Sequence, residues 1–261
     1  MAAHTHTANG PTKADKLADA INRLLYNLVI RCSKDDGIRD YFYVSIIGYN
    51  GNRVGSGFNG ILSERNLVPI SDIGNNPLRV DQRNRKEDDG AGGVIERTVK
   101  FPIWFEPLAS GGTPMRQALA LAKEQVSNWL IEHTDCFPPV IIHITDGEST
   151  DGDPADIMND IKNLSSTDGN VLLFNCHFTA NRSAQPIAFP GSPVNLVDQY
   201  ARGLFEGSSL FTPGMLEIAR NEHKIALEEN ARGYVLNADI TLVVLLLDIG
   251  TRGPEVTDPN R

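Results

Sequence analysis

The chain has 261 residues, with 24 Lys and Arg against 33 Asp and Glu, and so carries a formal net charge of −9. Hydrophobic residues make up 41% of the chain and charged residues 22%, a composition that excludes a disordered or fibrous protein and allows a substantial core. No sizeable stretch rich in Lys and Arg occurs, which argues against nucleic acid as the main partner.

The start of the chain and its cysteines bear on the compartment. Residues 1–16 contain no apolar run and therefore do not read as a secretory signal peptide. The apolar run at residues 240–247 is far shorter than the roughly 20 residues needed to cross a bilayer. Cys32, Cys136 and Cys176 lack the spacing of a metal site, and each is expected to pack as a small apolar group. The sequence predicts a cytoplasmic protein without a membrane partner.

The first third of the chain predicts a flexible tail, a helix and a hairpin. Residues 1–11 form the tail, and apolar residues recur at three- and four-residue spacing over residues 12–32, which predicts an amphipathic helix. Residues 41–49 and 54–62 are rich in aromatic and β-branched side chains and flank an Asn-Gly-Asn turn. They are predicted to pair as a hairpin, because Asn-Gly supplies the positive φ angles of a tight turn.

A polar region separates this hairpin from the next helix. Residues 63–95 include a dense run of charges followed by glycines, and we expect an inserted surface excursion there. Short apolar pieces return at residues 98–105. A helix is predicted to start at Thr113-Pro114, because proline fits the first helical position.

The second half of the chain alternates strands and helices. Residues 139–144 and 170–179 are apolar runs of the kind that form strands buried on both faces of a parallel sheet. The remaining predictions are a helix at 153–164, an interrupted helix at 211–230 and a strand at 233–236. This alternation predicts an α/β fold that is doubly wound, with a mostly parallel central sheet, one antiparallel edge strand and helices on both faces. We expect a single domain over residues 12–250 and a C-terminal tail at 251–261.

Two loops carry the chemistry of a candidate site. Ligands bind beyond the carboxyl ends of the strands in such a sheet, and the segments 110–115 and 144–148 lie at those ends. Thr113 offers a neutral oxygen, Asp146 offers a charged one, and the glycines beside them permit close approach of the backbone. Oxygen ligands from separate loops suit Mg²⁺ or Mn²⁺.

The order of these motifs resembles a known family. The hairpin, the Gly-Gly-Thr-Pro helix start and the Thr-Asp-Gly sequence after a strand are together similar to a von Willebrand factor type A (vWA) domain, over roughly residues 12–250. The resemblance implies a non-enzymatic protein-interaction module. In that family a metal-ion-dependent adhesion site binds a carboxylate of a protein partner, and Thr113 and Asp146 match two of its metal ligands.

The family's first metal-binding loop is absent from this sequence. That loop reads Asp-x-Ser-x-Ser and follows the first, central strand, whereas residues 1–11 contain no Asp, no Ser and no apolar strand. The resemblance places this loop upstream of Met1, and we expect the native reading frame to begin before it.

Residues 240–251 allow two interpretations. The first is a closing helix, capped by Asn237 or Asp239 and ended by Gly250. The second is a replacement strand that ends in Asp-x-Gly-Thr, in which Asp248 and Thr251 substitute for the missing ligands.

Two other functions compete with the adhesion reading. Asp146, Glu148, Asp151 and Asp153 form an acidic cluster that would suit a metal-dependent hydrolase or phosphotransferase, although no nucleophile or general base accompanies it. All but Asp146 are expected to be solvated loop charges or charges at a helix N-terminus. A metal-free scaffold that uses residues 63–95 as its partner surface is the other alternative. His143 and His177 are expected to be hydrogen-bonded core histidines.

Overall fold

The computed structural model describes residues 13–88, 94–107, 111–179, 185–196, 198–237 and 240–251. Its contacts cluster into two compact units. The first unit comprises Met1–Ile47 and Ser56–Ala109, and the second comprises Gly48–Gly55 and Ser110–Arg261. The single domain expected over residues 12–250 stays a prediction, and each unit is described by itself. Within the described residues no helix is both long enough and apolar enough to span a membrane.

Helix α1 (Lys13–Cys32) organises the first unit and confirms the predicted amphipathic helix. Its apolar stripe packs against the short helix α2 (Ile70–Asn75) and the end of the second long strand, where Trp104 is buried. Asn22 of α1 makes three hydrogen bonds there, which join the helix to the backbone of Trp104 and Phe105. The core of this unit consists of Leu25, Leu28, Val29, Cys32, Phe58, Leu62, Val68, Ile70, Ile73 and Trp104.

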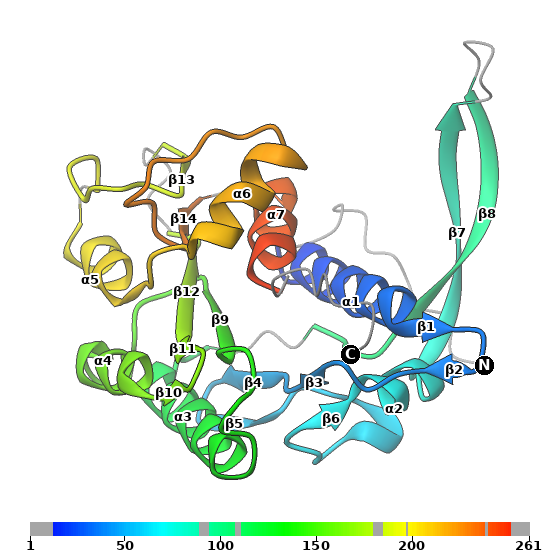
Figure 1. The fold of residues 1–261 in the computed structure, drawn as a ribbon, viewed down its shortest axis with the longest axis horizontal. Coiled ribbons are helices and arrows are strands. Elements are labelled where there is room, and N and C mark those ends of the chain that lie inside the picture. The colour runs from blue at the N-terminus through cyan, green and yellow to red at the C-terminus, as the bar shows by residue number, and fades with distance from the viewer. Residues whose placement is uncertain are drawn as a thin grey trace. The chain divides into compact units, whose positions relative to one another are not determined.

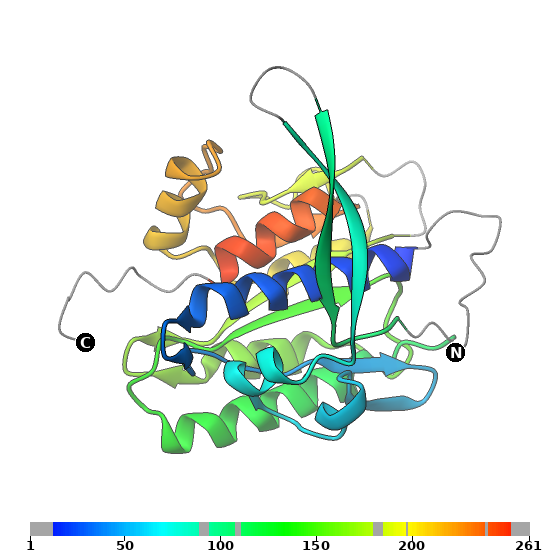
Figure 2. The same cartoon turned by 90° about the vertical axis from the view of Figure 1, so that its right-hand side faces the viewer.

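The strands of the first unit form small antiparallel pairs. Strand β1 (Ser33–Lys34) pairs with β2 (Gly37–Ile38), and β3 (Tyr43–Val44) pairs with β6 (Val68–Pro69). The two long strands β7 (Arg79–Asp88) and β8 (Val94–Ile103) form a hairpin that extends past α1 (Figures 1 and 2).

Residues 63–95, expected to be an inserted polar surface excursion, contain regular structure that was not predicted. This region contains β6, α2 and most of the hairpin, and Arg79 at the start of β7 lies opposite Ile103 at the end of β8. Strand β7 is polar on both faces and so lacks the alternating pattern that marks a half-buried strand. Its pairing depends on β8, and a local sequence pattern does not reveal that.

The predicted hairpin around Asn-Gly is confirmed in its central part. Strand β4 (Ile47–Asn50) pairs with β5 (Arg53–Ser56), and Gly51 in the turn has a positive φ of 54°. The second strand ends at Ser56, short of the predicted residue 62, because residues 60–62 form a single 3₁₀ turn.

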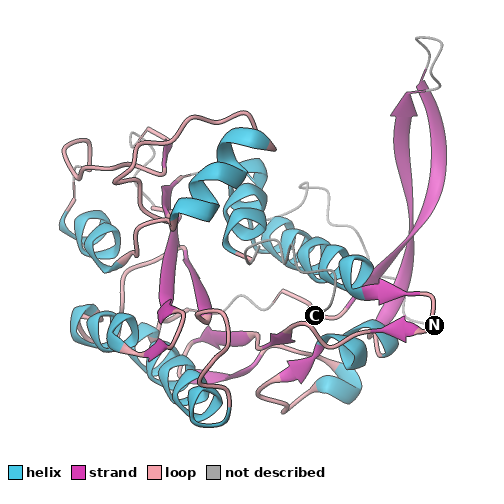
Figure 3. Cartoon of the chain, in the orientation of Figure 1, coloured by secondary structure: helices cyan, strands magenta, loops and turns pink. Residues whose placement is uncertain are grey.

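A four-stranded, mostly parallel sheet forms the centre of the second unit. Its order is β13-β14-β12-β9, in which β9 (Val140–Thr145), β12 (Leu172–His177) and β14 (Tyr234–Leu236) are parallel. The edge strand β13 (Ile187–Ala188) is antiparallel. The mixed α/β class is therefore confirmed. The other sheets in the described residues are two-stranded antiparallel pairs, including β10 (Ser165–Ser166) with β11 (Gly169–Asn170). Figure 3 marks the strands in magenta.

Helices cover both faces of this sheet (Figure 1). Helices α3 (Met115–Glu132), α4 (Ala155–Asn163) and α5 (Gln199–Gly207) pack on the face that carries Leu173. Helix α7 (Ile240–Gly250) packs on the opposite face, where Gly250 lies against Phe174, and α6 (Pro213–Asn221) packs on α7. The core of the first face comprises Met115, Leu119, Met158, Ile161, Val171, Leu173, Leu196, Ala201, Leu204, Phe205, Tyr234 and Leu236.

In the second half one helix was missed and two predictions need correction. Helix α5 was not predicted, although Asp198 caps it by accepting a hydrogen bond from the Ala201 N–H at 2.6 Å. The helix expected over residues 211–230 ends at Asn221. The strand interpretation of residues 240–251 was wrong, because Ile240–Gly250 is a helix and Asp248 is hydrogen-bonded to His223. One of its predicted caps, Asp239, lies outside the described residues.

Strand β9 lies at the edge of the four-stranded sheet, which its apolar sequence did not predict. The Pro139 and Thr145 carbonyls accept hydrogen bonds from Leu172 in β12 and from Phe178 just after it. Alternation therefore turns the backbone groups of residues 140, 142 and 144 away from β12. Within the described residues no strand pairs with that side. The Ile144 carbonyl there accepts the Tyr49 hydroxyl at 2.8 Å.

Candidate functional site

The two loops singled out from the sequence meet at the carboxyl end of β9. The Thr113 N–H donates to Thr150 Oγ1 at 3.0 Å, and the Thr150 N–H donates to the Thr113 carbonyl at 2.9 Å. A Cβ atom on Gly147 would lie 3.2 Å from the Thr113 hydroxyl oxygen. The Thr113 hydroxyl therefore lies against the residue that follows Asp146.

Gly112 anchors a third segment to this place. The Gly51 N–H in the β4–β5 turn donates to the Gly112 carbonyl at 3.2 Å. Gly112 has a φ of +94°, and a Cβ atom there would lie only 2.5 Å from the Gly51 carbonyl oxygen. Only glycine fits both requirements. The close backbone approach expected of the Gly-Gly pair thus occurs, and its partner is the hairpin turn.

Asp146 is exposed at the end of β9, in a turn shaped by Thr145, whose hydroxyl donates to the Gly147 carbonyl at 2.9 Å. The charge of Asp146 affects the pKa of the nearby Tyr49 side chain. Burial raises the pKa of the Tyr49 hydroxyl above its ordinary value, and the Asp146 carboxylate raises it further. Asp146 is therefore an accessible carboxylate beside a half-buried tyrosine.

Asp151 has a structural role that the sequence did not reveal. Its two carboxylate oxygens accept the backbone N–H groups of Arg116 at 3.0 Å and Gln117 at 2.9 Å, in the first turn of α3. Ser149 donates a third bond, at 2.8 Å. Burial alone would raise the pKa of Asp151, but these hydrogen bonds outweigh it and the pKa is lowered. The carboxylate thus caps a helix that lies more than thirty residues earlier in the chain.

Asp153, another residue of the acidic cluster, also contacts the start of a helix. Asp153 accepts the Ala155 N–H at 3.0 Å and so caps α4, as expected for a charge at a helix N-terminus. Arg116 links α3 to α4 through Asp156. Among the described residues no group of three or more His, Cys, Asp or Glu side chains is arranged to hold a metal ion. Thr113 and Asp146 contribute one hydroxyl and one carboxylate, fewer oxygens than the octahedral shell of Mg²⁺ requires, so water would have to complete that shell.

A chain of buried hydrogen bonds runs beneath the site. Asn175 donates to the Leu204 carbonyl and to Ser208, so its carbonyl oxygen accepts from His143 Nδ1 at 2.8 Å. His143 Nε2 lies 2.9 Å from the Tyr49 hydroxyl oxygen, and this hydroxyl donates its one proton to the Ile144 carbonyl at 2.8 Å. Burial lowers the pKa of His143 to about 4, which keeps the ring neutral at pH 7. The prediction of a hydrogen-bonded core histidine is confirmed for His143.

His177 fits that prediction only in part. It is buried, but its Nδ1 atom has no hydrogen-bond partner among the described residues. Burial also lowers its pKa.

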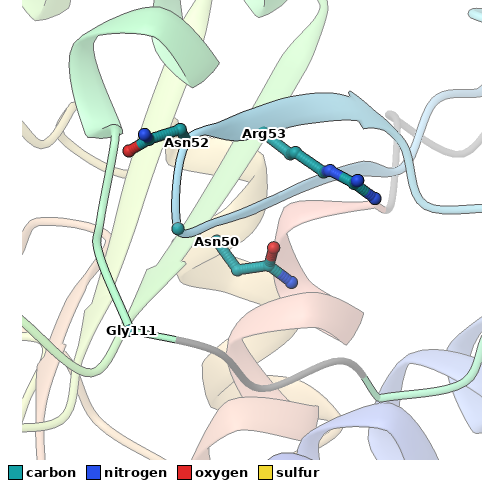
Figure 4. Close-up of a pocket in the computed structure, with 5 residues that line it drawn as sticks. Asn50, Asn52, Arg53 and Gly111 are labelled. Carbon is teal, nitrogen blue, oxygen red and sulfur yellow. The ribbon is translucent and has the colours of Figure 1, made fainter.

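A polar pocket opens beside these loops (Figure 4). Its volume is about 430 Å³, and the β4–β5 turn lines it together with Gly111. The lining residues are Asn50, Gly51, Asn52, Arg53 and Gly111. The sequence marked the turn but assigned no function to Arg53, because an isolated arginine in a hairpin carries no recognisable pattern.

Comparisons of the chain with protein-family models, with curated proteins and with solved structures found no match.

Proposed function

We propose that this chain is a non-enzymatic protein-interaction module with a doubly wound fold of the vWA type. Its site is a partial metal-ion-dependent adhesion site, to which Thr113 and Asp146 contribute. The observation that carries the proposal is the contact between their loops, in which the Thr113 hydroxyl lies against Gly147 and two hydrogen bonds join Thr113 to Thr150, one to its side-chain hydroxyl and one from its backbone N–H.

Two features of the second unit support the fold. Helices pack on both faces of its mostly parallel sheet. A doubly wound fold has further strands in its sheet, and these would need an unpaired edge with which to pair. Among the described residues, β9 has such an edge. These features support a doubly wound architecture without depending on the motifs.

The chemistry follows from oxygen ligands. Mg²⁺ or Mn²⁺ would supply a hard positive charge that binds a carboxylate of a protein partner. Thr113 would contribute a neutral oxygen and Asp146 a charged one, and the capped N-terminus of α3 holds the Thr113 loop in place. Since the chain supplies only these two oxygens, we expect a dissociation constant for Mg²⁺ or Mn²⁺ on the order of millimolar.

Paramagnetic broadening by Mn²⁺ in amide NMR spectra tests this site. We expect selective broadening of the Thr113 and Gly147 signals in the native chain and its loss in Asp146→Ala. The matched control is Asp168→Ala, which removes a carboxylate from the β10–β11 turn before β12 and should leave the broadening intact. Broadening that survives Asp146→Ala would refute the assignment and favour a metal-free scaffold.

The hydrolase alternative receives little support from the geometry. Asp151 and Asp153 accept helix N–H groups, which leaves Asp146 and Glu148 as the remaining carboxylates of the cluster. We expect no turnover of generic phosphoesters. A cytoplasmic location is proposed with the interaction function.

A further inference from the structure

We infer that the pocket at the β4–β5 turn binds a carboxylate side chain of a protein partner, with Arg53 as its cation. The inference rests on the proposed function for the kind of partner, an acidic protein segment. It adds a second binding point that needs no metal.

The hairpin places the polar groups of the pocket together. Asn50 and Arg53 flank the two-residue turn, so their side chains lie on the same face of the hairpin. Figure 4 shows them extending in the same direction, whereas Asn52 points the other way. An amide and a guanidinium are thereby presented side by side to a solvent-open pocket.

The lining suits an anion. No carboxylate lines the pocket, and Arg53 supplies a planar set of N–H donors that matches a carboxylate in a bidentate manner. Arg53 is exposed and has no ion pair among the described residues, whereas Arg39, Arg65 and Arg116 each contact an aspartate.

The pocket is held in shape before any partner arrives. The turn is fixed by the hydrogen bond from Gly51 to Gly112, and both glycines have positive φ. Less conformational entropy is therefore lost on binding than with a free loop.

Its position fits a partner with two carboxylates. Gly111 lines the pocket, and Thr113 follows two residues later, with its hydroxyl against the Asp146 loop. One acidic side chain of a partner could reach Arg53 while a neighbouring one reaches the Thr113 and Asp146 oxygens through a cation. The partner class is thus an acidic peptide segment.

The test measures binding of a fluorescent hexaglutamate peptide to the full chain in EDTA at 0.15 M salt, with hexaglutamine and free glutamate as comparison ligands. We expect hexaglutamate to bind and Arg53→Gln to weaken its binding about tenfold or more. Arg220→Gln makes the same charge change at an exposed site on α6 and should alter binding less than about twofold. Amide NMR spectra of each variant check that it is folded.

The outcomes separate this pocket from the metal site. Equal weakening by Arg53→Gln and Arg220→Gln would overturn the inference, since binding would then follow overall charge, and so would equal binding of hexaglutamine or of free glutamate. Binding that requires Mg²⁺ and is lost only in Asp146→Ala would overturn the pocket and leave the proposed function standing. Loss of binding in Arg53→Gln without any localised Mn²⁺ broadening would support the pocket and overturn the metal site.

Discussion

At the scale of single residues, the neutral histidine inside the second unit is the most consequential side chain. His143 is 5% exposed and links Tyr49 on one side to Asn175 on the other. Protonation would put a positive charge into a buried site, in which Nδ1 already donates to Asn175. Acidification should therefore lower the stability of the folded chain through this ring.

The first prediction concerns stability against pH. The pKa of His143 is lowered to about 4 by burial, below its ordinary value of 6.5, so the unfolded chain takes up the proton first as the pH falls. Its contribution to stability is complete above pH 6.5 and is lost as the pH falls toward 4, by up to about 3 kcal/mol. His177 acts in the same direction, because burial also lowers its pKa.

Urea unfolding at several pH values between 6.5 and 5 measures this effect. His143→Gln should lower stability at pH 7 and flatten the dependence of the unfolding free energy on pH. The same steep dependence in the variant and in the native chain would contradict the assignment.

At the scale of elements, the glycines before α3 determine whether the hairpin turn can dock. Gly112 has a φ of +94°, and a Cβ atom there would lie 2.5 Å from the Gly51 carbonyl oxygen. A Cβ atom on Gly111 would meet nothing within 4 Å. The two neighbouring glycines thus form a matched pair for a substitution experiment.

We expect Gly112→Ala to destabilise the chain by about 1–3 kcal/mol and to detach the turn, because both the φ angle and the contact are violated. Gly111→Ala should stay within about 0.5 kcal/mol of the native chain. Denaturant unfolding measures the stabilities, and the hydrogen-exchange rate of the Gly51 amide reports the docking. Equal effects of the two substitutions would show that the backbone contact contributes nothing.

The elements also show what the sequence could predict. Helices α1, α3 and α4 and strand β12 carry their own periodicity or apolar run, and each was predicted close to its observed bounds. Strand β7 was missed because its order comes from pairing with β8 rather than from its own pattern. Helix α5 could have been found, because Asp198 is a standard cap and Ala201, Leu204 and Phe205 recur at helical spacing.

The candidate site shows the same division. The sequence indicated both loops, and the structure brings them into contact. The sequence did not indicate that Asp151 caps α3, nor that Tyr49 contacts β9, since those partners lie 34 to 95 residues apart along the chain. Local patterns identify candidate residues, and the tertiary fold determines their neighbours.

At the scale of the whole molecule, each of the two units has a hydrophobic core of its own among the described residues. Ile73 lies in the core of the first unit and Leu173 in the core of the second, and both are fully buried. Each core joins helices to strands of its own unit. We expect the two units to respond separately to the loss of core volume.

Ile73→Ala and Leu173→Ala should each cost about 2–5 kcal/mol. Native-state hydrogen exchange should then show lost protection mainly in α1 and α2 for the first variant, and mainly in β9 and β12 for the second. Ile131→Ala, at a side chain that is 76% exposed, is the control and should change neither. Uniform loss of protection in both variants would mean that the chain unfolds as one cooperative body.

The unpaired side of β9 also bears on solubility. Residues 140–145 read Val-Ile-Ile-His-Ile-Thr and contain no lysine, aspartate or glutamate, whereas natural edge strands are usually protected by charges, prolines or bulges. Its backbone groups at residues 140 and 142, with which no strand of the described residues pairs, offer a ready template to another extended chain. Unless a further strand or a partner covers this edge, concentrated solutions of the chain should aggregate through β9, and light scattering against protein concentration measures that aggregation.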